Sequence, residues 1–223
     1  MSTSHRARTN PERDQVVEVI DAYRASPSPD ASFVALDDAL FASKRAAYLA
    51  ARRSMQKCAG AKTNANAAAA AADEAFDRDL RFFASSVRDS SGRAAPRVVS
   101  ALLGGVLPSK LITLSRREEV QRTTDMLASL PERADLIYDA NHAAALATST
   151  DALNSAQLAY EEADLAWLTA CDALGTARVG FDKAYAKLLK AGESMLEPGT
   201  FTSIFPRFVR RNPKTDDAEP VAP

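Results

Sequence analysis

The sequence predicts an all-α protein: an elongated antiparallel coiled-coil bundle built on two long, alanine-rich helices with short accessory helices. Alanine is abundant in the 223 residues, whereas glycine (8 residues) and aromatic residues (7%) are scarce, which is typical of long helices rather than of a sheet protein. A large apolar residue also recurs every seven positions in the C-terminal half, and two segments of opposite charge lie in the two halves of the chain. Together these observations favour two helices that face each other along one stripe.

The N-terminal part of the chain predicts a short helix and then the first long helix. An N-cap and first-turn pattern begins at Asn10, which predicts a helix over residues 11–24 after a disordered N-terminus over residues 1–10. A Ser-Pro-Ser-Pro tetrapeptide ends this helix. Asp30 is a good N-cap for the first long helix, over residues 31–89.

The remainder of the chain contains two Ser-x-x-Glu patterns, at Ser115 and Ser129, that are typical of helix starts. The second of them predicts a helix that ends before Gly192. The predicted segments after residue 89 are a connector over 90–114, a helix over 115–128, a long helix over 130–191, and a basic-aromatic segment with a disordered proline-rich tail over 193–223. Residues 11–192 are expected to form a single helical domain.

The strongest pattern lies in the second long helix, where a large apolar residue occupies every seventh position and an alanine or serine follows three residues later. A strict seven-residue repeat keeps one stripe of a helix against a partner helix, and small neighbours let the two backbones approach closely. We call the large residues the helix-packing seam: Leu146, Leu153, Tyr160, Trp167, Leu174, Phe181 and Leu188.

The first long helix carries a weaker version of this repeat, from Phe41 to Phe83. The alternative is a compact four-helix bundle, in which each long helix folds into a hairpin with a turn near 60–66 or 175–180, where glycine and asparagine weaken a helix. A hairpin has no reason to keep the seven-residue phase across its turn, yet the phase passes through both places. We therefore predict unbroken helices.

An antiparallel pair is favoured by the connector, because about forty residues that include their own helix join the two long helices most easily in that arrangement. The charge pattern agrees with this, although a parallel pair would satisfy much of it too. A stretch of the first long helix around Arg52 holds six basic residues and no acid, and a stretch of the second around Glu161 holds acids and no base. Surface ion pairs contribute little to stability, about 0–1 kcal/mol each, so this pattern bears on register more than on stability.

No catalytic, cofactor or metal motif is present in the sequence. His142 with Asp139 one turn earlier could form half of a metal site, but the only other histidine is His5, and a di-metal bundle needs two Glu-x-x-His motifs. The Gly104-Gly105 pair lacks the spacing of a phosphate-binding loop. We predict no catalytic, cofactor-binding or metal-binding residue, and therefore no enzyme.

Two acid-free segments, over 93–117 and 201–214, mix apolar and basic residues. Such a mixture suits contact with an anionic membrane or a partner protein; alternatively, these segments cover the ends of the helix pair. The predicted contact residues are Arg97, Leu102, Leu103, Lys110, Phe205, Arg207, Phe208, Arg210 and Arg211.

The net charge of −1 argues against nonspecific nucleic-acid binding. Cys58 and Cys171 form no metal-binding spacing, and together with the lack of a signal peptide or long apolar run this predicts a cytoplasmic protein. It would be membrane-peripheral if the two basic segments bind lipid rather than cover the ends of the helix pair. The expected function is that of a non-enzymatic scaffold or adaptor that associates through helices, with itself or with another helical protein. The alternative is a small helical subunit of a secretion or phage-like assembly.

Overall fold

The computed structural model describes residues 2–90, 92–93 and 96–210. The helices are α1 (Asn10–Arg24), α2 (Ala31–Leu40), α3 (Ala42–Ser86), α4 (Pro96–Leu102), α5 (Pro108–Leu111), α6 (Arg116–Ser129), the 3₁₀ helix η1 (Leu130–Glu132), α7 (Ala140–Met195) and α8 (Pro198–Ile204). Four short strands form two antiparallel pairs: β1 (Ser2–Ser4) with β4 (Phe208–Arg210), and β2 (Arg88–Asp89) with β3 (Leu136–Ile137).

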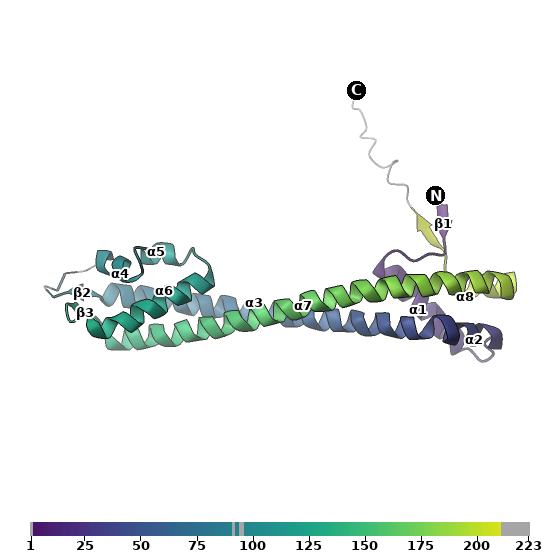
Figure 1. Ribbon diagram of the computed structural model, residues 1–223, viewed down its shortest axis with the longest axis horizontal. Helices are drawn as coiled ribbons and strands as arrows, with labels where there is room; N and C mark the ends of the chain where they lie inside the picture. Colours follow the sequence, from purple (N-terminus) through teal and green to yellow (C-terminus); the bar gives the residue numbers. More distant parts are fainter. Residues whose placement is uncertain (1, 91, 94–95, 211–223) are drawn as a thin grey trace, which may run out of the picture. The chain divides into compact units, whose positions relative to one another are not determined.

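The all-α prediction is confirmed, and the two long helices, α3 and α7, pack against each other (Figure 1). Both helices run without interruption through the weak points of the sequence, including Gly60 and Gly175. The hairpin turns that a compact four-helix bundle requires are therefore not formed.

The chain divides into two compact units, and α3 and α7 pass through both. Unit 1 comprises residues 1–55 and 170–223, and unit 2 comprises residues 56–169. In unit 1, Phe41, which immediately precedes α3, packs on Phe181 of α7 with 4.8 Å between ring centroids. In unit 2, the Nζ of Lys62 lies 3.9 Å from the ring centroid of Trp167, and Phe82 stacks on His142. Within unit 2, the earlier α3 residue, Lys62, contacts the later α7 residue, Trp167, and the later α3 residue, Phe82, contacts the earlier α7 residue, His142. The two helices are therefore antiparallel in this unit.

Each unit has its own apolar core. The core of unit 1 joins α1, α2, α8 and the adjoining parts of the long helices, and its largest fully buried side chains are Phe33, Phe41, Tyr48, Phe181, Tyr185 and Phe205. The core of unit 2 joins α4–α6 to the long helices through Phe76, Leu80, Phe83, Leu103, Leu111, Met126, Leu146 and Leu153.

The first long helix differs from the prediction because it is broken at Phe41. The backbone of Phe41 has φ −128° and ψ −35°, so α2 ends at Leu40 and α3 begins at Ala42. The side chain of Phe41 is fully buried in the core at this break. Because no glycine or proline lies there, the sequence does not predict it. The short helix before it also begins one residue earlier than predicted, because Thr9, rather than Asn10, is the N-cap and forms a capping box with Glu12.

The second long helix begins at Ala140, not near residue 130. The Oγ of Ser129 donates to the carbonyl of Met126 instead of capping a new helix, and η1 and β3 follow. Asp139 takes the capping role, since its Oδ1 accepts from the backbone N–H of Asn141 at 2.7 Å.

The C-terminal end of α7 extends past Gly192 to Met195. Gly192 therefore does not end the helix. Its role is in packing, since a Cβ at this position would lie 2.8 Å from Cε2 of Phe205. Residues 2–4, predicted to be disordered, form β1 against β4. The predicted proline-rich tail from residue 211 onward lies outside the described residues.

Candidate helix-association surface

The predicted seam divides into buried and half-buried positions. Leu146, Leu153, Phe181 and Leu188 are fully buried and Leu174 nearly so. Tyr160 and Trp167 are only half-buried. These two central residues belong to unit 2, and Trp167 is partly covered by Lys62, which also forms an ion pair with Asp164 at 2.6 Å.

Unit 2 contains a part of the helix pair that carries little cover, which we call the two-helix stretch: residues 56–72 of α3 and 155–169 of α7. Ala69 is the single buried residue among these, all of which the structure describes. Helices α4–α6 instead lie beside the part of unit 2 that carries β2 and β3 (Figure 1). The two-helix stretch therefore presents most of its side chains to the surroundings.

Three leucines of α7 are exposed in this stretch. Leu158 is 55% exposed, Leu165 is 66% exposed and Leu168 is 47% exposed. Their spacing of seven and three residues places them on one face of the helix. Leu165 lies two residues from both Ala163 and Trp167, and at about 100° per residue two steps lead to the opposite side of a helix. The leucine face is therefore turned away from α3.

The two helices of the stretch carry opposite charges. Residues 143–169 of α7 contain Asp151, Glu161, Glu162 and Asp164 but no Lys or Arg, whereas residues 56–72 of α3 contain Lys57 and Lys62 but no acid. Arg117 at the start of α6 pairs with Glu161, and Lys62 pairs with Asp164. Glu162, which borders the leucine face, is exposed.

The predicted membrane or partner contacts fall on two kinds of position. Leu103, Phe205 and Phe208 are buried in the cores, and Leu102 is half-buried. Arg97, Lys110 and Arg207 are exposed. Arg210 ends β4, and Arg211 lies outside the described residues.

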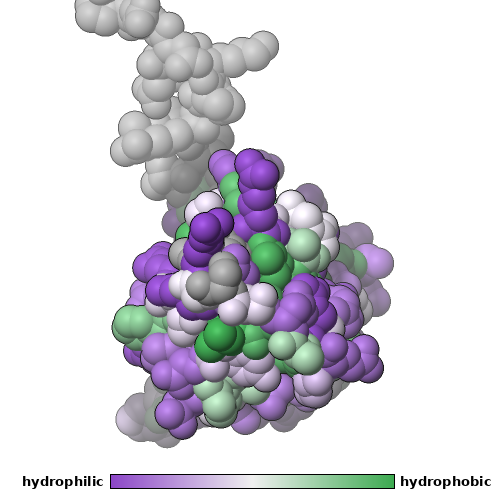
Figure 2. Space-filling model, turned by 90° about the vertical axis from the view of Figure 1, so that its left-hand side faces the viewer, coloured by the Kyte–Doolittle hydropathy of each residue, from purple (hydrophilic) through white to green (hydrophobic). Residues whose placement is uncertain are grey.

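The apolar members of these segments thus cover the cores of the two units, and the basic members are left on the surface. Arg122 of α6 stabilises the position of the connector, because its guanidinium donates a hydrogen bond to the carbonyl of Leu103 at 3.2 Å. Figure 2 faces the part of unit 2 that carries α4–α6, where hydrophobic patches are interrupted by hydrophilic side chains. A bilayer could reach Leu103, Phe205 and Phe208 only if the segments undocked.

Unit 2 contains a buried polar group that the sequence does not predict. Glu119 of α6 is 2% exposed and lies beside Asp73 and Asp77 of α3. Burial, together with the charges of these two carboxylates, raises the pKa of Glu119 to about 7. The Oε2 of Glu119, the Oδ1 of Asp77 and the Oγ1 of Thr123 are buried without a hydrogen-bond partner. No sequence signal could have shown this, because Glu119 follows Asp73 by 46 positions and its own helix begins with an ordinary Ser-x-x-Glu pattern.

The histidine, cysteine and acidic side chains of the described ranges do not gather into a metal site. No group of three or more His, Cys, Asp or Glu side chains is placed to hold a metal ion there. The ring of His142 stacks on Phe82, and Asp139 caps the start of α7 through backbone N–H groups. Cys58 and Cys171 are free, half-buried thiols.

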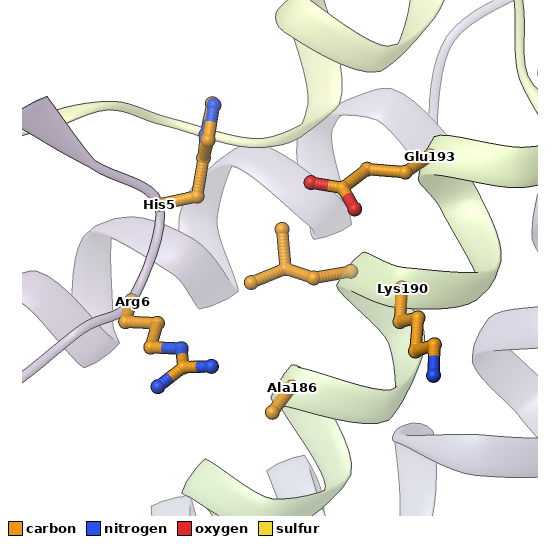
Figure 3. A pocket seen from close by; sticks show the side chains of 6 residues that line it. His5, Arg6, Ala186, Lys190 and Glu193 are labelled. Carbon is orange, nitrogen blue, oxygen red and sulfur yellow. The ribbon is translucent and has the colours of Figure 1, made fainter.

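A pocket of about 400 Å³ in unit 1 is lined by His5, Arg6, Ala186, Leu189, Lys190 and Glu193. The charged ends of its side chains point in different directions rather than toward one centre (Figure 3). Nδ1 of His5 hydrogen-bonds the carbonyl of Phe205 at 3.0 Å, and the ring packs edge-on against Phe201, so His5 holds the N-terminal segment to the core. The pocket therefore offers no convergent set of groups for catalysis.

Comparison with known protein families, curated proteins and solved structures gives no significant match for this chain. Among the described residues, no helix has both the length and the apolar character needed to cross a bilayer.

Proposed function

We propose that this chain is a non-enzymatic scaffold or adaptor protein that acts through helix association, in the manner of a coiled coil. The observation that carries the proposal is the exposed leucine face, Leu158, Leu165 and Leu168, on an uncovered part of α7. Single exposed apolar residues are common on proteins, but three large ones on one helical face are typical of a surface that binds another helix.

The chemistry of this face argues for a helix rather than a membrane as its partner. Glu161 and Glu162 lie beside the leucines, and residues 143–169 of α7 carry no base. An anionic bilayer would repel such a face. In the two basic segments, Leu103, Phe205 and Phe208 are buried, so only the exposed basic side chains of these segments could contact a membrane. Helix association is therefore the function that we propose.

The test is site-specific photo-crosslinking in the native cell, with a photoreactive residue at Leu165 and a matched control at Thr148. Thr148 is also exposed on α7 but lies outside the two-helix stretch. We expect crosslinks from position 165 to a defined helix-forming segment, identified by mass spectrometry of the joined peptides, and loss of these crosslinks in a Leu158→Glu/Leu168→Glu background. Crosslinking at position 165 that does not exceed the Thr148 control would overturn the proposal.

A further inference from the structure

The outer face of α3 in the two-helix stretch has the opposite shape to the leucine face of α7. Gly60, Asn64, Ala67 and Ala71 are all exposed, and their spacing of four, three and four residues places them along one stripe. Ala69 is buried and shares its side of α3 with Lys62, seven residues earlier, whose Nζ covers Trp167 of α7. Ala67 lies two residues from Ala69, and so lies on the side of α3 turned away from α7. A Cβ built on Gly60 would meet no atom within 4 Å, so the stripe is open.

The leucine face and this small-residue face match each other in length and spacing. Leu158 and Leu165 are seven residues apart, as are Gly60 and Ala67, and the leucine face spans eleven residues where the small-residue face spans twelve. Large side chains on one helix pack closely against small ones on another.

The charges of the two faces are also complementary. The leucine face is bordered by Glu162 and the small-residue face by Lys57, both exposed. The α7 part of the stretch has no base and the α3 part has no acid, so contact between two copies of α7 is disfavoured by like charges, and contact between α7 and α3 is favoured.

We propose that the occupant of the leucine face is the small-residue face of α3 in a second copy of this chain. This inference rests on the proposed function and names its partner. The two faces cannot meet within one chain, because each is turned away from the contact that α3 and α7 already make.

Because the two faces differ, the contact between copies is head-to-tail. Each copy that uses its leucine face still has a free small-residue face, and the reverse holds for its neighbour. Such a contact is heterologous, because it joins two different faces. It forms a closed ring if the rotation that relates neighbouring copies closes on itself, and otherwise continues into an open chain of copies.

The experiment is sedimentation velocity of the full-length protein over a wide concentration range, with variants that block one face each. Leu165→Glu blocks the leucine face, and Ala67→Glu blocks the small-residue face. Ala159→Glu is the matched control, because Ala159 is exposed on α7 but lies about 100° around the helix from Leu158. Circular dichroism establishes that every variant keeps its helices.

We expect the wild-type protein and Ala159→Glu to form species that grow with concentration, and each face variant alone to remain monomeric. An equimolar mixture of Leu165→Glu and Ala67→Glu is expected to form a 1:1 dimer and nothing larger, since one intact face of each kind remains in that mixture. This result would establish the head-to-tail contact.

Two results would overturn the inference in distinguishable ways. A wild-type protein that stays monomeric has no self-contact, and the proposed function then depends on the crosslinking experiment, which detects another helical protein. A closed dimer that is lost in Leu165→Glu but kept in Ala67→Glu would mean that the leucine face binds itself, which contradicts the inference and leaves helix association intact.

Discussion

Glu119 is held in unit 2 in a setting that favours its neutral form. Its side chain is nearly inaccessible to water, and Asp73 and Asp77 add negative charge, which the nearby Arg116 offsets only in part. The pKa of about 7 lies above the ordinary 4.5, so the folded protein holds this proton more tightly than the unfolded chain does. The corresponding stabilisation is complete below about pH 4.5 and is lost as the pH rises through about 7.

We predict that Glu119→Gln removes this pH dependence. The glutamine stays neutral, so the free energy of unfolding of the variant, relative to wild type, should rise between pH 4.5 and pH 8 by on the order of 3 kcal/mol. Urea unfolding at several pH values measures it, with the exposed neighbour Glu118→Gln as the control. Parallel pH profiles for wild type and Glu119→Gln would contradict the prediction.

Asp37 is the matching buried charge of unit 1. Its side chain is fully buried, accepts a hydrogen bond from Arg24 at 2.5 Å and forms an ion pair with Arg45 at 3.2 Å. We predict that Asp37→Asn lowers the free energy of unfolding by about 3 kcal/mol, because two guanidinium groups lose their shared carboxylate in a poorly hydrated place. Asp38 also pairs with Arg24, but its side chain is 56% exposed, so Asp38→Asn should cost less than about 1 kcal/mol. Equal losses in the two variants, measured by thermal unfolding, would refute the distinction.

At the scale of the helices, the glycines test whether α3 and α7 are continuous. Gly60 lies inside α3 with open space around its Cα, so Gly60→Ala should stabilise the protein by about 1 kcal/mol. Gly192→Ala should instead destabilise it by about 1–3 kcal/mol, because the new methyl group meets the buried ring of Phe205. Chemical unfolding of both variants measures the sign of each change in the free energy of unfolding. A destabilising Gly60→Ala would indicate a turn at that position.

The course of the helices was largely predictable and their ends were not. The seven-residue repeat predicts α7 from Leu146 onward because it records the contact with α3 at every second turn. The break at Phe41 and the continuation through Gly192 depend instead on which distant rings pack there, Phe181 in one case and Phe205 in the other. Local propensity carries no record of such contacts.

The leucine face was missed for a related reason. Leu158, Leu165 and Leu168 lie between the residues of the helix-packing seam, whose regular repeat dominates the pattern of this helix. The sequence alone therefore does not distinguish them as a second apolar face. Their exposure follows from the positions of α4–α6, and these positions depend on where the connector residues, such as Leu103 and Leu111, are buried.

At the scale of the whole molecule, the buried apolar side chains of the described residues form two large clusters that share no member, one in each unit. Each unit therefore has its own source of stability, and local unfolding can differ between them. We predict that Asp37→Asn accelerates hydrogen exchange for amides of α1 and α2 and leaves those of α6 unchanged. Glu119→Gln at pH 8 should slow exchange in α6 and leave α1 and α2 unchanged. Native-state exchange read by mass spectrometry tests this, and uniform changes along the chain would mean that the two cores unfold together.

The contact between Lys62 and Trp167 gives the protein an optical reporter of its own. Trp167 is the chain's one tryptophan, and its half-buried indole lies in the two-helix stretch beneath an ammonium group. Because Trp167 lies on the side of α7 opposite the leucine face, its emission is sensitive to the water and the charge at the contact between α3 and α7 within one chain. A shift of that emission to longer wavelength with rising denaturant would therefore follow the separation of these two helices in unlabelled protein.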